Sequence, residues 1–224
     1  ENVAKKFNIL REEQQEFAIS SHNKAYEAQK NGKLSEEIIP IGECKEDGNI
    51  RPNSTQEKLD QLKLAFDTKG TVTAATSSPL TDGAAATIIC EENYAKENNL
   101  NILGRIISTA VEGCDPDYMG LGPIGASKKA LMRADLSIDK IDIFELNEAF
   151  ASQSLACIKD LGIDQKKVNI DGGALALGHP LGATGARITG KAADLLRREN
   201  KKYALSTQCI GLGMGIATVI ESVD

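Results

Sequence analysis

Hydrophobic and polar positions in the first part of the chain follow the spacing of amphipathic helices. Within residues 1–30, apolar positions such as Val3 and Phe17 lie among polar ones and predict two helices, the second opening with charged residues. A polar stretch with glycine and proline at 42–55 predicts a loop. We therefore expect residues 1–80 to be mostly helical, with long connections.

Beyond residue 66 the pattern changes to short runs rich in Thr, Val and Ile, which are separated by segments with helical spacing. The predicted strands are residues 70–78, 84–90, 102–111, 141–146, 203–209 and 214–222. The predicted helices are residues 91–99, 123–134, 147–162, which ends at Gly162, and 182–200. Strands that alternate with helices favour an α/β fold with a layered sheet.

Composition narrows the function classes. The chain has 224 residues, 41% of them hydrophobic, which is typical of a globular protein with a core. Its net charge of −6 argues against nucleic acid as the main partner. No run is long and apolar enough to span a membrane, and no signal peptide opens the sequence.

The cysteines bear on compartment and completeness. Five scattered cysteines without a C-x-x-C pair indicate neither a metal site nor a disulfide framework, and they favour a reducing compartment such as the cytoplasm. In a eukaryote the equivalent compartment would be the mitochondrial matrix or the peroxisome. The chain begins inside a helical pattern without an initiator methionine, so we expect it to be part of a longer protein.

The first candidate for chemistry is His179, in the stretch "GGALALGHPLGATGAR" at 172–187. Five glycines and several alanines surround this imidazole, and Pro180 disfavours helix at His179. Either the backbone turns tightly here, or something large comes close to the ring. For a single histidine in a glycine-rich loop, a purely structural role is the commoner explanation.

Two further candidates lie where predicted strands give way to turns. Cys209 closes a strand and is followed by glycines, beginning with Gly211, whose backbone N–H groups could face a ligand oxygen. The thiol is either a nucleophile or proton carrier, or an inert buried cysteine. Asn147 is either the N-cap of the helix that follows, with Glu148 in its first turn, or a group that orients a water.

Together these residues supply acid/base and oxyanion-binding groups. The chain has no G-x-S-x-G nucleophile elbow, and one His with one Cys is too few for a zinc site. The strings "GLGPIG" and "GLGMGIA" do not open a βαβ unit with a suitably placed acidic residue, so a dinucleotide site is not indicated.

Several long segments, in order along the chain, resemble the signatures of the thiolase family: "GTVTAATSSPLTDGAAA", "GCDPDYMGLGP", "LNEAFASQSLACIKDLG", "NIDGGALALGHPLGATGARI" and "CIGLGMGIATVIE". The resemblance covers essentially the whole chain. It implies an α/β fold in which 102–224 form a layered α-β-α half with a mixed sheet, the C-terminal thiolase domain. Residues 1–80 would then be a partial, mostly helical lid domain, and 81–101 the last elements of the N-terminal domain.

The resemblance also implies roles for the candidates. His179 would activate a nucleophilic cysteine and help to hold the thioester oxygen. Cys209 would be the second cysteine, a proton carrier. Asn147 would bind the water that completes one oxyanion hole, and the N–H of Gly211 would donate in the other.

For coenzyme A, the co-substrate, the resemblance implies four contacts. Ser78 would meet the pantetheine chain, Phe66 and Arg51 would lie on the lid near coenzyme A, and Met119 would line the acyl pocket. No metal and no permanently bound cofactor is implied.

The chain departs from the family pattern at one point, because no cysteine here matches the motif of the nucleophile. The implied activity is CoA-dependent thiolysis of 3-ketoacyl-CoA, as in fatty acid β-oxidation, with the acyl-cysteine supplied from outside these residues and the chain alone inactive. The alternatives are an acetyl-CoA acetyltransferase, which usually carries a further glycine at the position of Leu212, and a non-catalytic thiolase-like subunit. Ketosynthases fit less well, since they carry a histidine where Asn147 stands.

The implied partners are acyl-CoA substrates and further protein subunits. Thiolases are usually homodimers or tetramers, and β-oxidation types can join a hydratase/dehydrogenase subunit. A chain without the N-terminal half is also expected to expose apolar surface and to aggregate.

Overall fold

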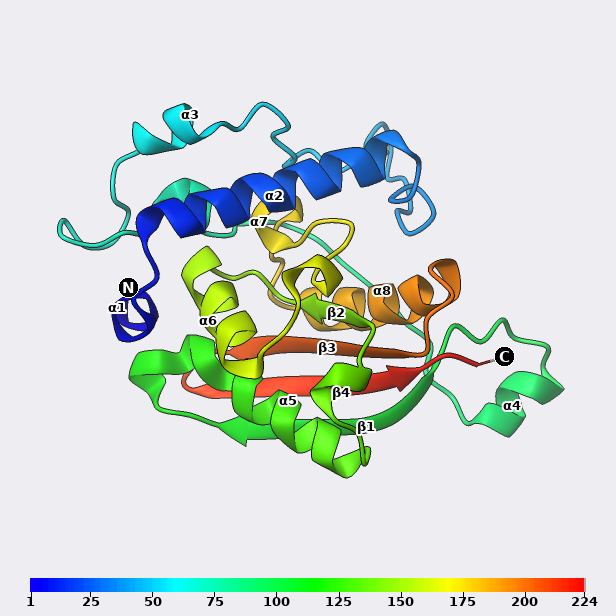
Figure 1. Ribbon diagram of the computed structural model, residues 1–224. Coiled ribbons are helices and arrows are strands. Elements are labelled where there is room, and N and C mark those ends of the chain that lie inside the picture. The colour runs from blue at the N-terminus through cyan, green and yellow to red at the C-terminus, as the bar shows by residue number, and fades with distance from the viewer. Residues whose placement is uncertain (224) are drawn as a thin grey trace.

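The computed structural model describes residues 1–223 (Figure 1). The α-helices are α1 (Asn2–Phe7), α2 (Arg11–Lys30), α3 (Gln56–Asp60), α4 (Glu92–Glu97), α5 (Gly122–Arg133), α6 (Ala151–Leu161), α7 (Ala174–Leu177) and α8 (Thr184–Arg198). The strands are β1 (Arg105–Gly113), β2 (Ile143–Leu146), β3 (Tyr203–Ile210) and β4 (Met214–Glu221). Short 3-10 helices, η1 to η4, lie at Ala74–Thr76, Pro116–Leu121, Ile138–Lys140 and Gln165–Lys167.

The four strands form one mixed sheet in the order β1-β4-β3-β2. β2 runs parallel to β3, and the pairs β3–β4 and β4–β1 are antiparallel. All four residues of β2 are buried, as expected for a strand covered on both faces. The predicted α/β class with a mixed sheet is confirmed.

Alternating side chains divide the core between the two faces of the sheet. Phe144 and Leu205 pack with α5 and α6, whereas their neighbours Ile143 and Ala204 pack with α8. This alternation follows from the strand period of two. In Figure 1, α8 and α5 accordingly lie on opposite sides of the strands.

The helices end for local reasons that the sequence shows. α6 stops at Gly162, which takes a left-handed conformation with φ of 66° and donates its N–H to the last turn. This helix end is predicted correctly. No helix in residues 1–223 is long and apolar enough to cross a membrane.

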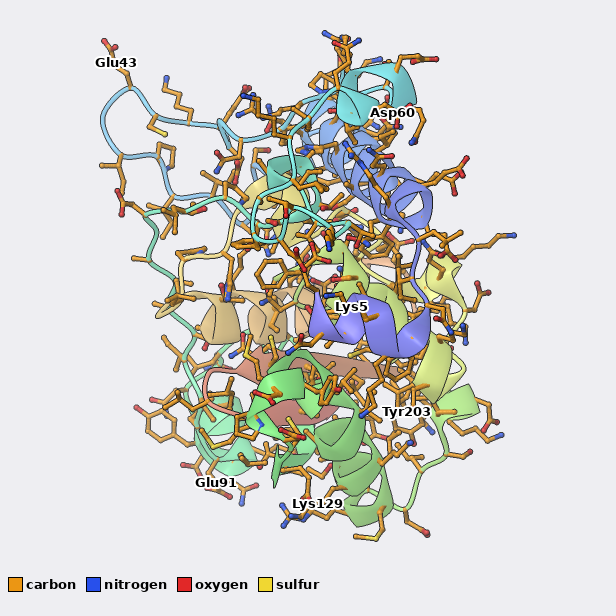
Figure 2. The ribbon with its side chains drawn as sticks, turned by 90° about the vertical axis from the view of Figure 1, so that its left-hand side faces the viewer. Lys5, Glu43, Asp60, Glu91, Lys129 and Tyr203 are labelled. Carbon is orange, nitrogen blue, oxygen red and sulfur yellow. The ribbon has the colours of Figure 1, made fainter. Side chains whose placement is uncertain are left out.

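The N-terminal residues lie across the end of the α/β unit rather than apart from it. α2 packs on α7 through an apolar cluster that includes Ala25, Leu34 and Leu177. The loop after α2 is tied down by Glu37, whose carboxylate accepts from Lys191 of α8 at 3.0 Å. Figure 2 shows Glu43 at the outer tip of this loop and Lys129 of α5 at the opposite end of the view.

Two predicted strands are wrong. Residues 70–78 contain the short helix η1 instead, and residues 84–90 form no regular structure and are exposed. Their β-branched residues favour extended backbone, but a strand also needs a neighbour that satisfies its N–H and C=O groups. Within the described residues, 70–78 make only the isolated bridges Leu64–Thr73 and Ser77–Phe150.

Candidate active site

His179 lies in the turn between α7 and α8. Gly178, which precedes it, has φ of 93°, and a side chain there would overlap that of Thr81. The N–H of His179 donates to Thr81 Oγ1 at 3.2 Å. The glycine is therefore needed both for the turn and for the close approach of a distant segment.

The ring of His179 contacts Asn147 at the C-terminal end of β2. Asn147 Nδ2 lies 3.3 Å from His179 Nε2, and on the other side of the ring Nδ1 lies 2.8 Å from Thr184 Oγ1. Burial lowers the pKa of His179 below its ordinary value, so the imidazole is neutral at neutral pH and can accept a proton.

Asn147 is not a helix N-cap. α6 begins four residues later at Ala151, with Phe150 at the N-cap position. The backbone N–H of Asn147 donates to Thr207 of β3 at 2.9 Å and so extends the strand pairing by one residue. Its side chain is buried, and Oδ1 has no hydrogen-bond partner within the described residues. A buried amide oxygen of this kind is suited to accept from a water or a ligand.

Glu148 is not exposed in a first helical turn either; it is buried directly after Asn147 in the chain. Its carboxylate accepts from Ser21 Oγ at 2.6 Å, from Asn169 Nδ2 at 2.7 Å and from the N–H of Leu175 at 3.1 Å. Burial raises the pKa of Glu148, and these three hydrogen bonds oppose the rise.

The Glu148 carboxylate therefore joins α2, the end of β2 and the start of α7, which leads to His179. Asn169 strengthens this link by accepting from the N–H of Leu146 at 2.9 Å and donating to its carbonyl at 2.8 Å. The sequence analysis did not identify Glu148 and Asn169 as residues that hold the site in place. The only signal was a glutamate directly after Asn147.

Cys209 lies near the end of β3, where it pairs with Gly215 of β4. A side chain at Gly215 would overlap the backbone of Gly122, so this face of the strands touches the start of α5. Because paired residues of antiparallel strands share a face, the thiol of Cys209 points to the same side. Burial raises its pKa to about 11, so Cys209 is a protonated thiol at neutral pH.

Gly211 lies in the exposed turn between β3 and β4, directly beyond the strand that carries Cys209. No atom comes within 4 Å of the position that a Gly211 side chain would take, so its backbone is open on that side.

The four residues predicted to contact coenzyme A do not all lie in one part of the structure. Ser78 donates its N–H to Ala149 at 3.0 Å, and Phe66 packs edge-on against Phe150 with ring centroids 6.0 Å apart. Both therefore lie beside the loop that follows Asn147.

Met119 and Arg51 lie elsewhere. Met119 is in η2, which packs against β3 and β4. Arg51 is exposed, and its N–H donates to the ring of His22 on α2 at 3.1 Å.

Other features of the described residues mark no second site of this kind. A hollow of about 1020 Å³ beside α4 and the end of α8 is lined mainly by charged side chains and contains none of the candidate residues. Within residues 1–223, no group of three or more His, Cys, Asp or Glu could hold a metal ion.

The fold is that of an α/β protein. Its candidate site consists of the neutral imidazole of His179, the buried amide of Asn147 and the protonated thiol of Cys209, which lie at the ends of neighbouring segments. Residues 1–93 match the thiolase N-terminal domain family and residues 100–222 match the thiolase C-terminal domain family. The chain belongs to the thiolase family.

Curated relatives carry the name 3-ketoacyl-CoA thiolase. The protein from Vibrio vulnificus (strain CMCP6) is 50% identical over 234 residues, which cover 99% of this chain and 60% of the relative. The protein from Salmonella typhimurium is 50% identical over 236 residues, covering 100% of this chain and 61% of the relative. The chain thus spans about three fifths of the length of these relatives.

Solved structures agree with the fold. The Bacillus anthracis acetyl-CoA acetyltransferase superposes with a TM-score of 0.95 at 41% identity, over 99% of this chain and 58% of that protein. Human mitochondrial 3-ketoacyl-CoA thiolase in complex with CoA superposes with a TM-score of 0.93 at 41% identity, over 99% of this chain and 57% of that protein.

Proposed function

We propose that the protein containing this chain is an acetyl-CoA C-acyltransferase that cleaves 3-ketoacyl-CoA with coenzyme A, giving acetyl-CoA and a shortened acyl-CoA, as in fatty acid β-oxidation. The observation that carries the proposal is the contact between Asn147 and the neutral His179, at the junction of two family-specific segments. The 50% identity to proteins named 3-ketoacyl-CoA thiolase supports the choice of reaction.

In this proposal the chemistry divides between two steps. A cysteine thiolate attacks the 3-keto carbon, the bond between C2 and C3 breaks, and its electron pair forms the enolate of acetyl-CoA. Cys209 gives its proton to that enolate. In the second step the thiol of coenzyme A loses its proton to the thiolate of Cys209 and attacks the acyl-cysteine, which releases the shortened acyl-CoA.

The other residues act on protons and developing charge. His179 takes the proton from the nucleophilic cysteine before the first attack, which its lowered pKa permits. Asn147, through a water at its unpartnered Oδ1, and the N–H of Gly211 serve the two thioester oxygens. A hydrogen-bond donor in such a position contributes on the order of 3 kcal/mol to transition-state stabilisation.

We further propose that the nucleophilic cysteine lies outside these 224 residues. Cys157 is fully buried and burial raises its pKa far above the ordinary range, so it is a poor nucleophile. Burial also raises the pKa of Cys114, and Cys44 and Cys90 are exposed outside the site. This chain alone is therefore expected to bind acyl-CoA without turning it over.

Coenzyme A binding at Ser78, Phe66, Arg51 and Met119 belongs to the same proposal. Ser78 and Phe66 have the best support, since both contact the loop that follows Asn147. We also propose that the protein assembles into a homodimer or tetramer, with or without a hydratase/dehydrogenase subunit. Its proposed location is the cytoplasm.

The test is a thiolysis assay on the full-length protein with 3-ketoacyl-CoA substrates of increasing chain length. We expect CoA-dependent cleavage that His179→Ala reduces by about 10²–10⁴, the range for a lost acid/base group. Glu12→Ala on the exposed side of α2 serves as the control. A full-length protein that binds but never cleaves these substrates would leave only a non-catalytic subunit.

A second candidate is an acetyl-CoA acetyltransferase, favoured by the 0.95 TM-score to the Bacillus anthracis enzyme. The same assay separates the two. Activity confined to acetoacetyl-CoA, with condensation of two acetyl-CoA molecules, would favour the second candidate over the first.

A further inference from the structure

We infer that Thr184 is a positioning residue that fixes His179 in the tautomer with the proton on Nδ1, leaving Nε2, on the side of Asn147, unprotonated. The functional meaning of this tautomer rests on the function proposed above, whereas the tautomer itself is a property of these residues and can be measured without catalysis.

The hydroxyl of Thr184 settles the proton on one side of the ring. Thr184 is buried at the start of α8, with Oγ1 at 3.0 Å from the carbonyl oxygen of Pro180 and 2.8 Å from His179 Nδ1. The Pro180 carbonyl, which also accepts from the backbone N–H groups of Ala183 and Thr184, takes the single hydroxyl proton in the arrangement that we infer. The oxygen lone pair then faces Nδ1, which must carry a proton to complete the bond.

Asn147 leads to the same tautomer from the other side of the ring. Its Nδ2 lies 3.3 Å from His179 Nε2, and an amide nitrogen can only donate. Nε2 must therefore be unprotonated when the imidazole is neutral. Two hydrogen bonds from segments distant in the sequence thus require one tautomer.

The tautomer determines which ring nitrogen of His179 can accept a proton in the proposed reaction. A neutral imidazole can accept a proton only at its unprotonated nitrogen. With the proton held on Nδ1, that nitrogen is Nε2, on the side of Asn147. With the opposite tautomer, the ring would present an N–H to the cysteine and could not act as its base.

His22, the only other histidine of the chain, provides an internal reference. The backbone N–H of Arg51 donates to His22 Nδ1 at 3.1 Å, so that nitrogen is unprotonated and the proton is on Nε2. The two rings are expected to hold opposite tautomers in one molecule.

The experiment uses the full-length protein that contains this chain, with isotope-labelled histidine. Long-range proton–nitrogen correlation spectra at about pH 8, where both rings are neutral, report which ring nitrogen carries the proton. The His22→Gln and His179→Gln variants assign the two sets of signals. We expect a protonated Nδ1 for His179 and a protonated Nε2 for His22.

Variants of Thr184 test the cause. Thr184→Val keeps the shape but removes the hydroxyl, and we expect the Nδ1-protonated signal of His179 to weaken in favour of the Nε2-protonated form. Thr184→Ser should restore it. Thr189→Val, on the same helix and bonded to Ser206 instead, should change nothing.

A parent spectrum with His179 protonated on Nε2 overturns the inference, and so does a Thr184→Val chain that retains the parent tautomer. If Thr184→Val fails to fold, the parent spectrum and the Thr184→Ser spectrum still decide it. None of these results depends on thiolysis, so failure here is distinct from failure of the proposed function.

Discussion

At the scale of single residues, burial holds the two ionisable groups of the site in their uncharged forms. It lowers the pKa of His179 and raises the pKa of Cys209 to about 11. A neutral base and a protonated thiol are complementary states for proton transfer. Removal of water is the largest cause of both shifts in pKa.

The role of Cys209 can be tested by replacing it with serine in the full-length protein. Serine is smaller and a much poorer acid near neutral pH, so turnover should fall by about 10²–10⁴ while coenzyme A affinity is largely retained. Steady-state thiolysis and CoA binding measure the two quantities. Cys114→Ser, also at a thiol whose pKa burial raises, is the matched control and should behave like the parent. Turnover of Cys209→Ser within about threefold of the parent would assign Cys209 a structural role.

A second buried carboxyl, Glu145, predicts a pH dependence of stability. Burial raises its pKa to about 8 from 4.5, and Arg187 and Lys191 oppose the rise. Because the folded pKa exceeds the unfolded one, the stability that Glu145 contributes is complete below pH 4.5 and is lost as the pH rises to about 8.

Glu145→Gln should remove this pH dependence. Between about pH 5 and pH 8, the free energy of unfolding of the parent should fall relative to the variant by at most about 1.4 kcal/mol per pH unit. Urea unfolding across this pH range measures it. Glu12→Gln, at an exposed position, should follow the parent. Parallel curves for parent and Glu145→Gln would show that Glu145 ionises as freely in the folded chain as in the unfolded one.

At the scale of elements, the turn between β3 and β4 carries a conformational cost. Leu212 has φ of 71°, a conformation that disfavours residues with a side chain, and it is 90% exposed. Exposure means that no packing offsets this cost. The turn also contains Gly211, so its geometry affects the candidate site.

Leu212→Gly should therefore stabilise the chain by about 0.5–1 kcal/mol, since the relief of backbone strain exceeds the added entropy of the unfolded state. Leu181→Gly is the matched control, because Leu181 is 80% exposed and is not among the positive-φ residues. Urea midpoints of the two variants measure the difference. Equal loss of stability in both would contradict the strain at Leu212.

At the scale of the whole molecule, residues 79–90 form a connection that runs from the candidate site, past α8, to α4. It contacts the His179 turn through Thr81, lies against α8 at Thr87, and leads to α4, near which Figure 2 labels Glu91. Its apolar residues Ile88 and Ile89 are 89% and 71% exposed. An extended apolar segment with unpaired backbone groups favours association.

We expect this chain to associate in solution through that segment. Replacing Ile88 and Ile89 by lysine should reduce the scattering mass measured by light scattering, because charge opposes strand pairing. Leu212→Lys, at an isolated exposed leucine, should not. A parent chain that is a stable monomer at all concentrations would contradict the expectation.

Much of the fold could be predicted because its signals are local. The helix periodicity of α5 and α8, the Gly162 stop and the short apolar runs of β3 and β4 are properties of neighbouring residues. The predictions at 70–78 and 84–90 failed because strand formation depends on a partner strand, which the local sequence does not specify. α7 was missed because four residues are too short for a periodic pattern.

For the site, the sequence by itself determined which residue types are available: His179 in a glycine-rich turn, and Asn147 and Cys209 at strand ends. Only the tertiary structure decided that Asn147 meets His179 rather than capping α6, and that Thr184 and Glu148 hold the two loops. The physical reason is that a hydrogen bond depends on positions within a few ångströms, whereas these partners are joined by chain segments that many folds could arrange differently. Burial, which sets the protonation of His179 and Cys209, is likewise a property of the packed molecule and not of any single segment.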